Sequence, residues 1–535
     1  MMLLSLQKDA KDILSSLYSS ESQYGPASLR DLSSPSDDAL PVMTLDLSSL
    51  ITDVLIEIFR YLEIRDILSM RLTSRRFQNI TMLREVWLNT VHEKVFGRGL
   101  QLPGRTHPDL LAHSVSTLES LTRHAAQLSE NWAQPSPTPT SVLEFDERVP
   151  NGYITQIHFL PGRAAKYLIT VSSASHVISW EIVGRARRAR MMAEWKTDGV
   201  ILDVVVNTKE EDEAALAIST MFHGIHSVEV LTFNPQGNED TIPVFTLLRS
   251  TTTMGRLKSL RGDLLTFYKR MGATVLVDWR TGNQGMLKRQ NEPSRTLTAS
   301  LAMEFCYGAV LIVTSHTIEL YQKPELVPFV PSPSARLPPS EGRPLGYLEF
   351  PQEARSAAIT PYVRLLADGS DPSGRTHPDR PLSILLRLKE GPRDEIRHYV
   401  LRPALFPLSP SAPDYTPYEF PPQLIQVRTA NPHFYADIQI NPSGRGFWVE
   451  NFTAVNVGRP REHLVGFLPG ERKRKGYDEG DEWETGSELI DIEAPYKILG
   501  VQHDVLKCTD CSYDDATGRI AIGSYNGKVK ILDFA

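Results

Sequence analysis

The sequence has little cysteine and no long hydrophobic run. Its three cysteines, among 535 residues, stand at positions 306, 508 and 511. Three thiols cannot form a disulfide framework, and this indicates a reducing compartment. No stretch approaches the roughly 18 apolar residues of a membrane span. Lys8 and Asp9 interrupt the apolar N-terminus before a signal-peptide core can form. We therefore predict a soluble protein of the cytoplasm, the nucleus or both.

The sequence also has no excess of basic residues. The formal net charge is −7, with 57 Lys and Arg against 64 Asp and Glu. A protein with a general role on nucleic acid or on an anionic membrane surface carries a basic patch or stripe. We therefore expect neither kind of partner. The length allows two or more domains, or one large β domain with a small one beside it.

Motifs that would carry catalysis or bind a cofactor are also missing. The pair Cys508-x-x-Cys511 has no second pair to complete a zinc site, and residues three apart on a strand point to opposite faces. Gly523 to Lys528 has the wrong spacing for a phosphate-binding loop. Neither Gly-x-Ser-x-Gly nor His-Glu-x-x-His occurs. We predict a protein that is not an enzyme, with no catalytic residue, metal or cofactor.

What the sequence does contain is a strongly apolar stretch from position 50 to position 87. Apolar residues at 51, 54, 55, 58, 59 and 62 are spaced so that they lie on one side of an α-helix. Thr52 and Asp53 suit the start of this helix. Asp66 is the expected N-cap of a second helix, and Ser74 that of a third helix, which extends to Trp87.

Three such helices make a unit that is small for its apolar content. About forty residues bury too little surface to be stable without a staple or a partner. Part of the surface must therefore be covered by a second polypeptide or, alternatively, by the remainder of this chain, on which an ordinary helical hairpin would pack. Three or four side chains buried against a partner, at roughly 1.5–3 kcal/mol each, would contribute about 5–12 kcal/mol before the costs of association.

The order of residues in this stretch is itself informative. It runs Leu50, Asp53, Val54-Leu55, Ile58-Phe59, Leu62, Asp66-Ile67-Leu68, Arg71-Leu72, Arg75-Arg76-Phe77 and Trp87. This order resembles the F-box, a three-helix module that docks on the Skp adaptor of cullin-based ubiquitin ligases. Ile51 departs from the usual proline and Ser74 from the usual cysteine. The resemblance implies a Skp-type adaptor and, through it, a cullin as partners. The adaptor-binding residues that it implies are Leu50, Ile51, Val54, Leu55, Ile58, Phe59, Leu62, Ile67, Leu68, Leu72 and Trp87.

Four segments are expected before a β-rich region begins. Residues 1–46 predict a weakly ordered tail, and residues 47–91 are the F-box. Apolar residues at helical spacing across 92–134 predict a helical connector that packs against both neighbours. Residues 135–140 contain three prolines and are expected to form a stiff linker.

From residue 141 to residue 535, short β-rich runs alternate with turn residues, which predicts an antiparallel all-β domain. The spacing of about 45–60 residues per four-strand unit favours a β-propeller of about seven blades over an immunoglobulin-like sandwich. Excursions interrupt the pattern at 323–344, 402–422 and 469–487. In the last of these, the basic run 472–475 is either a solvated loop or a localisation signal.

The last unit, 507–534, shows the repeat most clearly. Arg519 to Ser524 predicts a strand, Asn526-Gly527 a type I′ turn, and Lys528 to Phe534 another strand. Ile531-Leu532-Asp533 resembles the Val-Trp-Asp of WD-repeat blades, which implies a WD-like propeller. This unit has only three strands, so its edge needs a fourth. We predict that strand 141–146 joins it and closes the ring.

The predicted fold class is thus α+β multidomain, with a three-helix F-box and a helical connector followed by an all-β propeller. The resemblance implies the substrate-recognition subunit of a Skp–cullin–F-box ubiquitin ligase, whose propeller binds a target protein. One alternative is an F-box scaffold that binds the adaptor without ubiquitin transfer. Another is a propeller enzyme with an incidental helical hairpin. The sequence does not indicate which propeller loops bind a target.

Overall fold

The structure is a computed structural model of the chain. It describes residues 47–98, 100–104, 110–134, 137–146, 152–184, 188–209, 212–235, 244–253, 255–269, 273–288, 300–306, 308–328, 340–361, 381–391, 393–404, 415–430, 438–441, 445–453, 460–467, 496–503 and 508–535. The predicted tail 1–46, the basic run 472–475 and the excursion 469–487 lie outside these residues, as do parts of the other two excursions.

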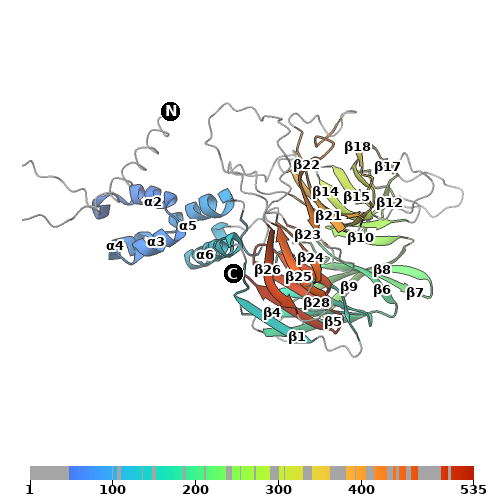
Figure 1. Ribbon diagram of the computed structural model, residues 1–535, viewed down its shortest axis with the longest axis horizontal. Helices are drawn as coiled ribbons and strands as arrows, with labels where there is room; N and C mark the ends of the chain where they lie inside the picture. Colours follow the sequence, from blue (N-terminus) through green and yellow to red (C-terminus); the bar gives the residue numbers. More distant parts are fainter. Residues whose placement is uncertain are drawn as a thin grey trace, which may run out of the picture. The chain divides into compact units, whose positions relative to one another are not determined.

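Helices come first along the chain (Figure 1). The α-helices are α2 (Thr52–Tyr61), α3 (Ile64–Arg71), α4 (Arg75–Ile80), α5 (Arg84–Thr90) and α6 (Val115–Ala133). Short single-turn elements are η2 (Leu47–Ser49), η3 (Val91–Val95), η4 (Phe96–Arg98) and η5 (Leu110–Ala112). Among the described residues, no helix is both long enough and apolar enough to cross a membrane.

Local geometry explains where these helices begin. Ser74 caps α4 as predicted, because its Oγ accepts a hydrogen bond from the N–H of Phe77 at 3.2 Å. The predicted cap of α3, Asp66, is wrong: Glu63 is the extended residue before the helix, and Asp66 lies in the first turn. The third predicted helix is divided into α4 and α5, because Leu83 has extended backbone, with φ −74° and ψ 144°.

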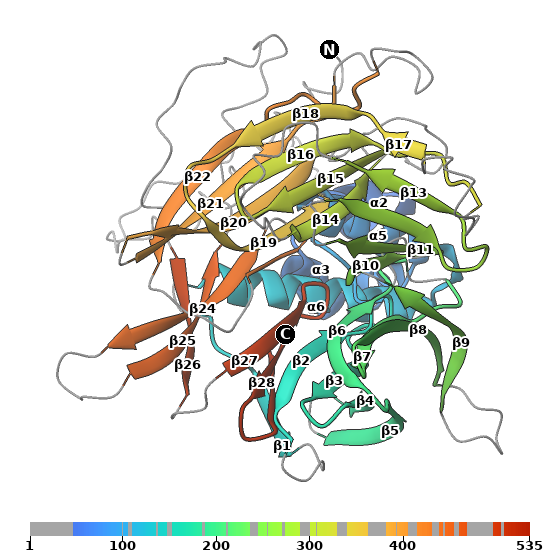
Figure 2. The ribbon, with the colours of Figure 1, turned by 90° about the vertical axis from the view of Figure 1, so that its right-hand side faces the viewer.

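The strands that follow form seven sheets among the described residues, and Figure 2 shows these sheets arranged about a common centre. The first sheet contains β2 (Ile154–Phe159), β3 (Tyr167–Ser172), β4 (His176–Val183) and β5 (Arg188–Lys196), the second contains β6 (Val200–Val206), β7 (Leu216–Phe222), β8 (Ile225–Asn234) and β9 (Val244–Thr253), and the third contains β10 (Arg256–Arg261), β11 (Leu264–Tyr268), β12 (Thr274–Asp278), β13 (Gln284–Leu287) and β17 (Ser340–Gly342). The fourth sheet contains β14 (Ser300–Cys306), β15 (Ala309–Thr314), β16 (Thr317–Gln322) and β18 (Pro344–Glu349), and the fifth contains β19 (Ala354–Pro361), β20 (Leu382–Glu390), β21 (Arg393–Leu401) and β22 (Gln423–Ala430). The sixth sheet contains β23 (Gln439–Ile440), β24 (Gly446–Thr453), β25 (Pro460–Phe467) and β26 (Tyr496–His503), and the seventh combines β27 (Cys508–Asp514), β28 (Arg519–Ser524) and β29 (Lys528–Asp533) with β1 (Ser141–Asp146).

The predicted fold class is confirmed, since a helical N-terminal region precedes an all-β propeller. One strand lies where the sequence predicts an excursion. Ser340–Gly342 falls within the predicted excursion 323–344, yet this strand, β17, pairs in parallel with β13 and adds a fifth strand. Backbone pairing with a neighbouring strand, more than β propensity, therefore determines that this short segment is a strand.

The inner strands of the propeller share a structural device. The first strands of six sheets carry a register shift near their start, among them Ile154/Gln156 in β2 and Cys508/Asp510 in β27. The residue after the shift can reach the next sheet. Gln156 Oε1 accepts from the N–H of Val204 and Asp510 Oδ2 from that of Ile157, both at 2.8 Å. These side chains thereby tie adjacent sheets together through backbone groups that no strand partner uses.

The strand expected to close the ring is β1. It pairs antiparallel with β29, from Ser141 opposite Asp533 to Asp146 opposite Lys528. Its residues alternate between half-buried and exposed, and the half-buried Phe145 lies against Trp180 of β4 with ring centroids 4.8 Å apart. The edge of β29 is therefore paired, and β1 also adds apolar contacts to the core between two sheets.

The hairpin turn between β28 and β29 differs from its prediction. Gly527 has a positive φ of 76°, but Asn526 does not, so the turn is not type I′. The N–H of Gly527 bonds to the carbonyl of Ser524, which places Tyr525 and Asn526 at the centre of the turn. The Asn526 side chain instead accepts from the N–H of Lys528 at 3.2 Å, an interaction typical of asparagine in turns.

Shortening Phe145 tests the contribution of β1. Phe145→Ala should lower the melting temperature by several degrees, because it removes a half-buried ring from the core, at a cost of about 1–3 kcal/mol. Val142→Ala, on the exposed face of the same strand, is the matched control and should change it little. Thermal unfolding followed by circular dichroism measures both. Equal melting temperatures for Phe145→Ala and the parent would contradict this role.

A buried histidine makes the stability of the propeller depend on pH. His398, on β21, is 1% exposed, and its Nε2 lies 2.7 Å from the Oγ of Ser383. Burial lowers the pKa of His398 from 6.5 to about 4, because the charged form is poorly solvated there. The unfolded chain therefore binds a proton before the folded chain does. This contribution to stability is full above pH 6.5 and is lost as pH falls toward 4.

Removing this group should flatten the pH dependence. His398→Gln keeps a hydrogen-bonding partner for Ser383 and should lose less unfolding free energy than the parent between about pH 7 and pH 5. Urea unfolding at the two pH values measures the difference. His92→Gln, on the exposed surface of η3, is the control and should keep the parent's slope. An unchanged slope for His398→Gln would show that this histidine is not the source.

Candidate functional site

The apolar stripe on α2 is divided between the interior of the chain and its surface. Leu55 and Phe59 are buried: the Phe59 ring meets Phe77 of α4 edge-to-face at 6.2 Å. Ile67 of α3 and Trp87 of α5 are fully buried as well. For these four residues, direct adaptor binding is not supported, because the helices that follow α2 already cover their side chains. Part of the apolar surface is thus covered by this chain itself.

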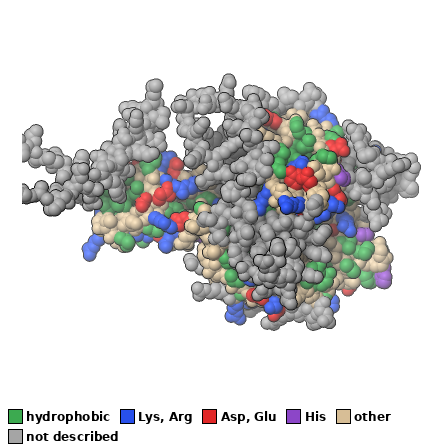
Figure 3. Space-filling view, viewed as in Figure 1, with side chains coloured by type: hydrophobic (Ala, Val, Ile, Leu, Met, Phe, Trp, Pro, Cys, Tyr) green, Lys and Arg blue, Asp and Glu red, His purple; other side chains and the backbone are tan. Residues whose placement is uncertain are grey.

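Other residues of the predicted set are accessible. Ile51 is 67% exposed, and Val54 follows it at helical spacing on the same side of α2. Leu72, just after α3, is 87% exposed. The remaining members of the set, each half-buried, are Leu50, Ile58, Leu62 and Leu68. Figure 3 shows hydrophobic side chains between acidic and basic ones over the helical region. We call Ile51, Val54, Ile58, Leu68 and Leu72 the helical face.

A polar clamp that the sequence did not predict fixes the helices behind this face. The Arg71 guanidinium donates to both carboxylate oxygens of Glu119 on α6, at 3.0 and 2.9 Å. It also donates to Thr81 Oγ1 and O, at 3.1 and 3.2 Å, and lies 5.7 Å from the centre of the Trp87 ring. The Trp87 indole N–H in turn donates to Thr81 O at 2.8 Å. A bidentate arginine–carboxylate pair fixes the relative orientation of the two side chains as well as their distance.

The other end of α6 packs on the propeller. Trp132 stacks on Phe534 with ring centroids 5.0 Å apart, and Asn131 Nδ2 donates to Phe534 O at 2.7 Å. Leu128 fills the space beside Gly518, where a Cβ would lie 2.2 Å from Leu128 Cδ1. Gly518 also has a φ of 69°, so only glycine meets both requirements. The helix that holds the clamp therefore shares a core with the last sheet.

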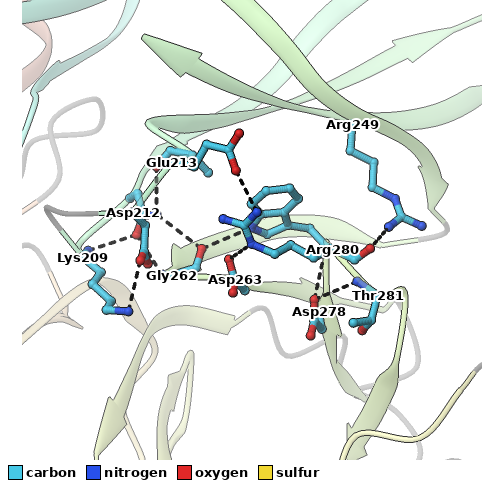
Figure 4. A network of polar contacts seen from close by, with 12 residues as sticks. Lys209, Asp212, Glu213, Arg249, Gly262, Asp263, Asp278, Arg280 and Thr281 are labelled. Atoms are coloured by element: carbon cyan, nitrogen blue, oxygen red, sulfur yellow. Dashed lines mark hydrogen bonds and ion pairs between the residues drawn. The ribbon is translucent and has the colours of Figure 1, made fainter. Parts of the chain in front are cut away.

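The sheets carry a separate network of charges, drawn in Figure 4. Arg280 donates to Asp263 at 2.6 Å and to Glu213 at 2.7 Å, and its guanidinium lies 4.4 Å from the ring centre of Trp279. Lys209 donates to Asp212 at 3.1 Å. These residues come from the β6–β7, β10–β11 and β12–β13 connections, which therefore lie together. Paired in this way, the charges brace one end of two sheets, and nothing in the network singles out a reactive group.

The orientation predicted for the two cysteines of the C-x-x-C pair is wrong. Residues three apart should point to opposite faces, but β27 shifts register between Cys508 and Asp510. Both Cys508 and Cys511 therefore lie in one apolar cluster, together with Phe534, and both are buried and form no disulfide. Within the described part of the chain, no group of His, Cys, Asp and Glu side chains could hold a metal ion.

Breaking the clamp should destabilise the helices. Glu119→Gln leaves the half-buried Arg71 without its carboxylate and should reduce the free energy of unfolding by about 1–3 kcal/mol. Glu57→Gln, which removes an exposed partner of Arg60, is the control, with an expected loss of about 0–1 kcal/mol. Urea unfolding followed by tryptophan fluorescence measures both. A loss for Glu119→Gln no larger than the control's would show that the clamp adds little.

Comparison with known proteins gives matches of two kinds. Residues 47–89 match the family model described as the F-box domain. The β-propeller domain of Cps50 (Swd1) from Myceliophteria thermophila is similar to 73% of this chain and 99% of its own, with a TM-score of 0.43 and 10% identity. No curated protein matches the sequence. An F-box joined to a propeller is typical of non-catalytic adaptor proteins, and F-box domains generally bind Skp-type adaptors. The chain therefore carries an F-box domain at residues 47–89 followed by a β-propeller.

Proposed function

We propose that this chain is the substrate-recognition subunit of a Skp–cullin–F-box ubiquitin ligase. The helical face would dock on a Skp-type adaptor, and the propeller would hold a target protein. The observation that carries this proposal is the F-box match at 47–89, combined with apolar side chains that remain exposed within it. Such a complex operates in the cytoplasm or nucleus, and three cysteines that form no disulfide with one another are consistent with those compartments.

The mechanism needs no reactive group in this chain. A receptor of this kind raises the effective concentration of a target near a ubiquitin-loaded enzyme, and its own contribution is position and orientation. Position requires a stiff connection between the two binding regions. The Arg71–Glu119 clamp at one end of α6 and the Trp132–Phe534 stack at the other provide one.

The exposed part of the stripe gives the sharpest test of adaptor binding. Ile51→Asp combined with Val54→Asp should weaken capture of the Skp adaptor by roughly a hundredfold or more, because two charges replace apolar contacts. The melting temperature should not change, since both side chains are exposed. Leu111→Asp on η5, at 74% exposure, is the matched control outside the F-box. Binding of purified adaptor by calorimetry measures each variant.

Leu55→Asp is unsuitable for this purpose, because it places a charge in the core and should unfold the helices. Full adaptor binding by the Ile51/Val54 variant would contradict the proposed docking face. A reconstituted reaction with adaptor, cullin and ubiquitin-loaded enzyme then separates the two F-box hypotheses. Target-bound ubiquitin supports a receptor, whereas adaptor binding without ubiquitin transfer supports a scaffold.

A further inference from the structure

The turn between β7 and β8 is apolar and exposed. Phe222 and Ile225 pair across it, and the two residues between them, His223 and Gly224, have φ values of 49° and 79°. This is a tight two-residue hairpin of the kind that usually carries Asn or Gly. Phe222 is 50% exposed and Ile225 is 60% exposed. Large apolar side chains at such a tip do not contribute to the core of their own sheet.

Two further apolar residues extend this tip into a patch. Val200, the first residue of β6, pairs with Met221 of β7, and both are exposed. Gly199 lets the strands come this close, because a Cβ there would lie 2.8 Å from Met221 O. Val200, Met221, Phe222 and Ile225 form what we call the blade-tip patch. Scattered exposed apolar residues are ordinary, but four at one end of three adjacent strands are a candidate contact surface.

Cations from the next sheet border the blade-tip patch. Arg256 and Lys258 lie at the start of β10, and Lys269 follows Tyr268, which pairs with Arg256. Burial raises the pKa of Asp203 on β6, and the charges of Lys258 and Arg256 oppose that rise. β10 also runs parallel to β6, since Asn207, just after β6, bridges to Leu260 of β10. Both cations therefore lie beside the strand that begins with Val200.

The pairing of charges differs between the two ends of these sheets. At the end drawn in Figure 4, Arg280 and Lys209 have carboxylate partners. At the blade-tip end, Arg256, Lys258 and Lys269 form no ion pair with any described residue. On the far side of the patch, Glu194 is already bonded to His176, and Asp198 is exposed. Asp203 is one carboxylate near three cations, so the β10 side keeps an excess of positive charge.

We propose that the blade-tip patch and these three cations bind an acidic, apolar segment of a target protein. Aromatic or aliphatic side chains of the segment would lie on Phe222 and Ile225, and its carboxylates beside Arg256, Lys258 and Lys269. The inference rests on the proposed function, since it names the class of segment that the propeller would hold. Few charged pairs and a compact apolar centre are typical of a peptide contact.

Two other occupants fit these residues less well. Three cations on a chain of net charge −7 supply little attraction for an anionic membrane. A second copy bound through the same patch by two-fold symmetry would bring like charges together, because both copies would contribute Arg256, Lys258 and Lys269. An acidic segment satisfies both the apolar surface and the unmatched charge.

The test uses the full chain and a defined peptide panel. Each fluorescent peptide of about fifteen residues carries Phe-x-x-Leu flanked by Asp and Glu, by Asn and Gln, or by Lys. We expect the acidic peptides to bind most tightly in anisotropy titrations and to weaken as salt rises. Phe222→Ser with Ile225→Ser should weaken this binding by about tenfold or more. Val244→Ser with Leu247→Ser, on β9 of the same sheet at 49% and 43% exposure, is the control and should not weaken it.

Charge reversal gives a second, independent readout. Arg256→Glu with Lys269→Glu should lose the acidic peptides and gain the Lys peptides, a change that a misfolded protein would not produce. The inference is overturned if acidic peptides bind no better than neutral ones, or if the two apolar double variants bind alike. Phe222-dependent pelleting with phosphatidylserine vesicles, or a Phe222-dependent dimer in sedimentation, would also overturn it. Adaptor binding, measured in parallel on the same samples, should be unaffected, so its loss in the Ile51/Val54 variant tests the proposed function separately.

Discussion

The contact between α6 and the last sheet is the constraint on which the rest of the structure depends. Trp132 and Leu128 do not merely touch the propeller. They complete an apolar cluster that contains residues of β24, β27 and β28, so removing them would expose the core of two sheets. Because the same helix also holds Arg71 through Glu119, α6 connects the F-box helices to the propeller through contacts at both of its ends. A receptor gains from such stiffness, since effective concentration falls when a connection is loose.

The distribution of charge supports a division of roles within the propeller. Where the β6–β7, β10–β11 and β12–β13 connections meet, arginine and lysine are matched by carboxylates of the same chain. Where β6, β7 and β10 present their other ends, apolar side chains are exposed and three cations lie near one carboxylate, that of Asp203. Matched charges stabilise loops at modest cost, whereas unmatched ones beside apolar surface favour association with another molecule.

The sequence was sufficient for the order and type of the main elements. The 3–1–3 spacing on α2 and the Ser74 cap depend on neighbours within one turn, so they can be read directly. Which part of the stripe is covered could not be read. Val54 and Leu55 are equally apolar, and the difference in their burial is made by α4 and α5, twenty to thirty residues further along.

The same limit applies to the sheets and to the candidate contact surface. Ala354–Pro361 has weak β propensity, and β19 exists because β20 supplies its hydrogen bonds. The turn at Asn526-Gly527 has a strong local signal, yet the surrounding strands select another geometry. For the blade-tip patch, no signal in the sequence indicates that Phe222 is exposed or that Arg256, from the next sheet, would lie near it.

Pairing of β1 with β29 has a consequence for how the protein is made. The two strands are separated by nearly the whole propeller in sequence, and β1 leaves the ribosome long before its partner exists. During synthesis the early sheets can form while the ring stays open, with apolar residues of β1 waiting for a strand still to be translated. Closure must therefore wait until β29 has been translated, and the nascent chain is most in need of chaperones before that point.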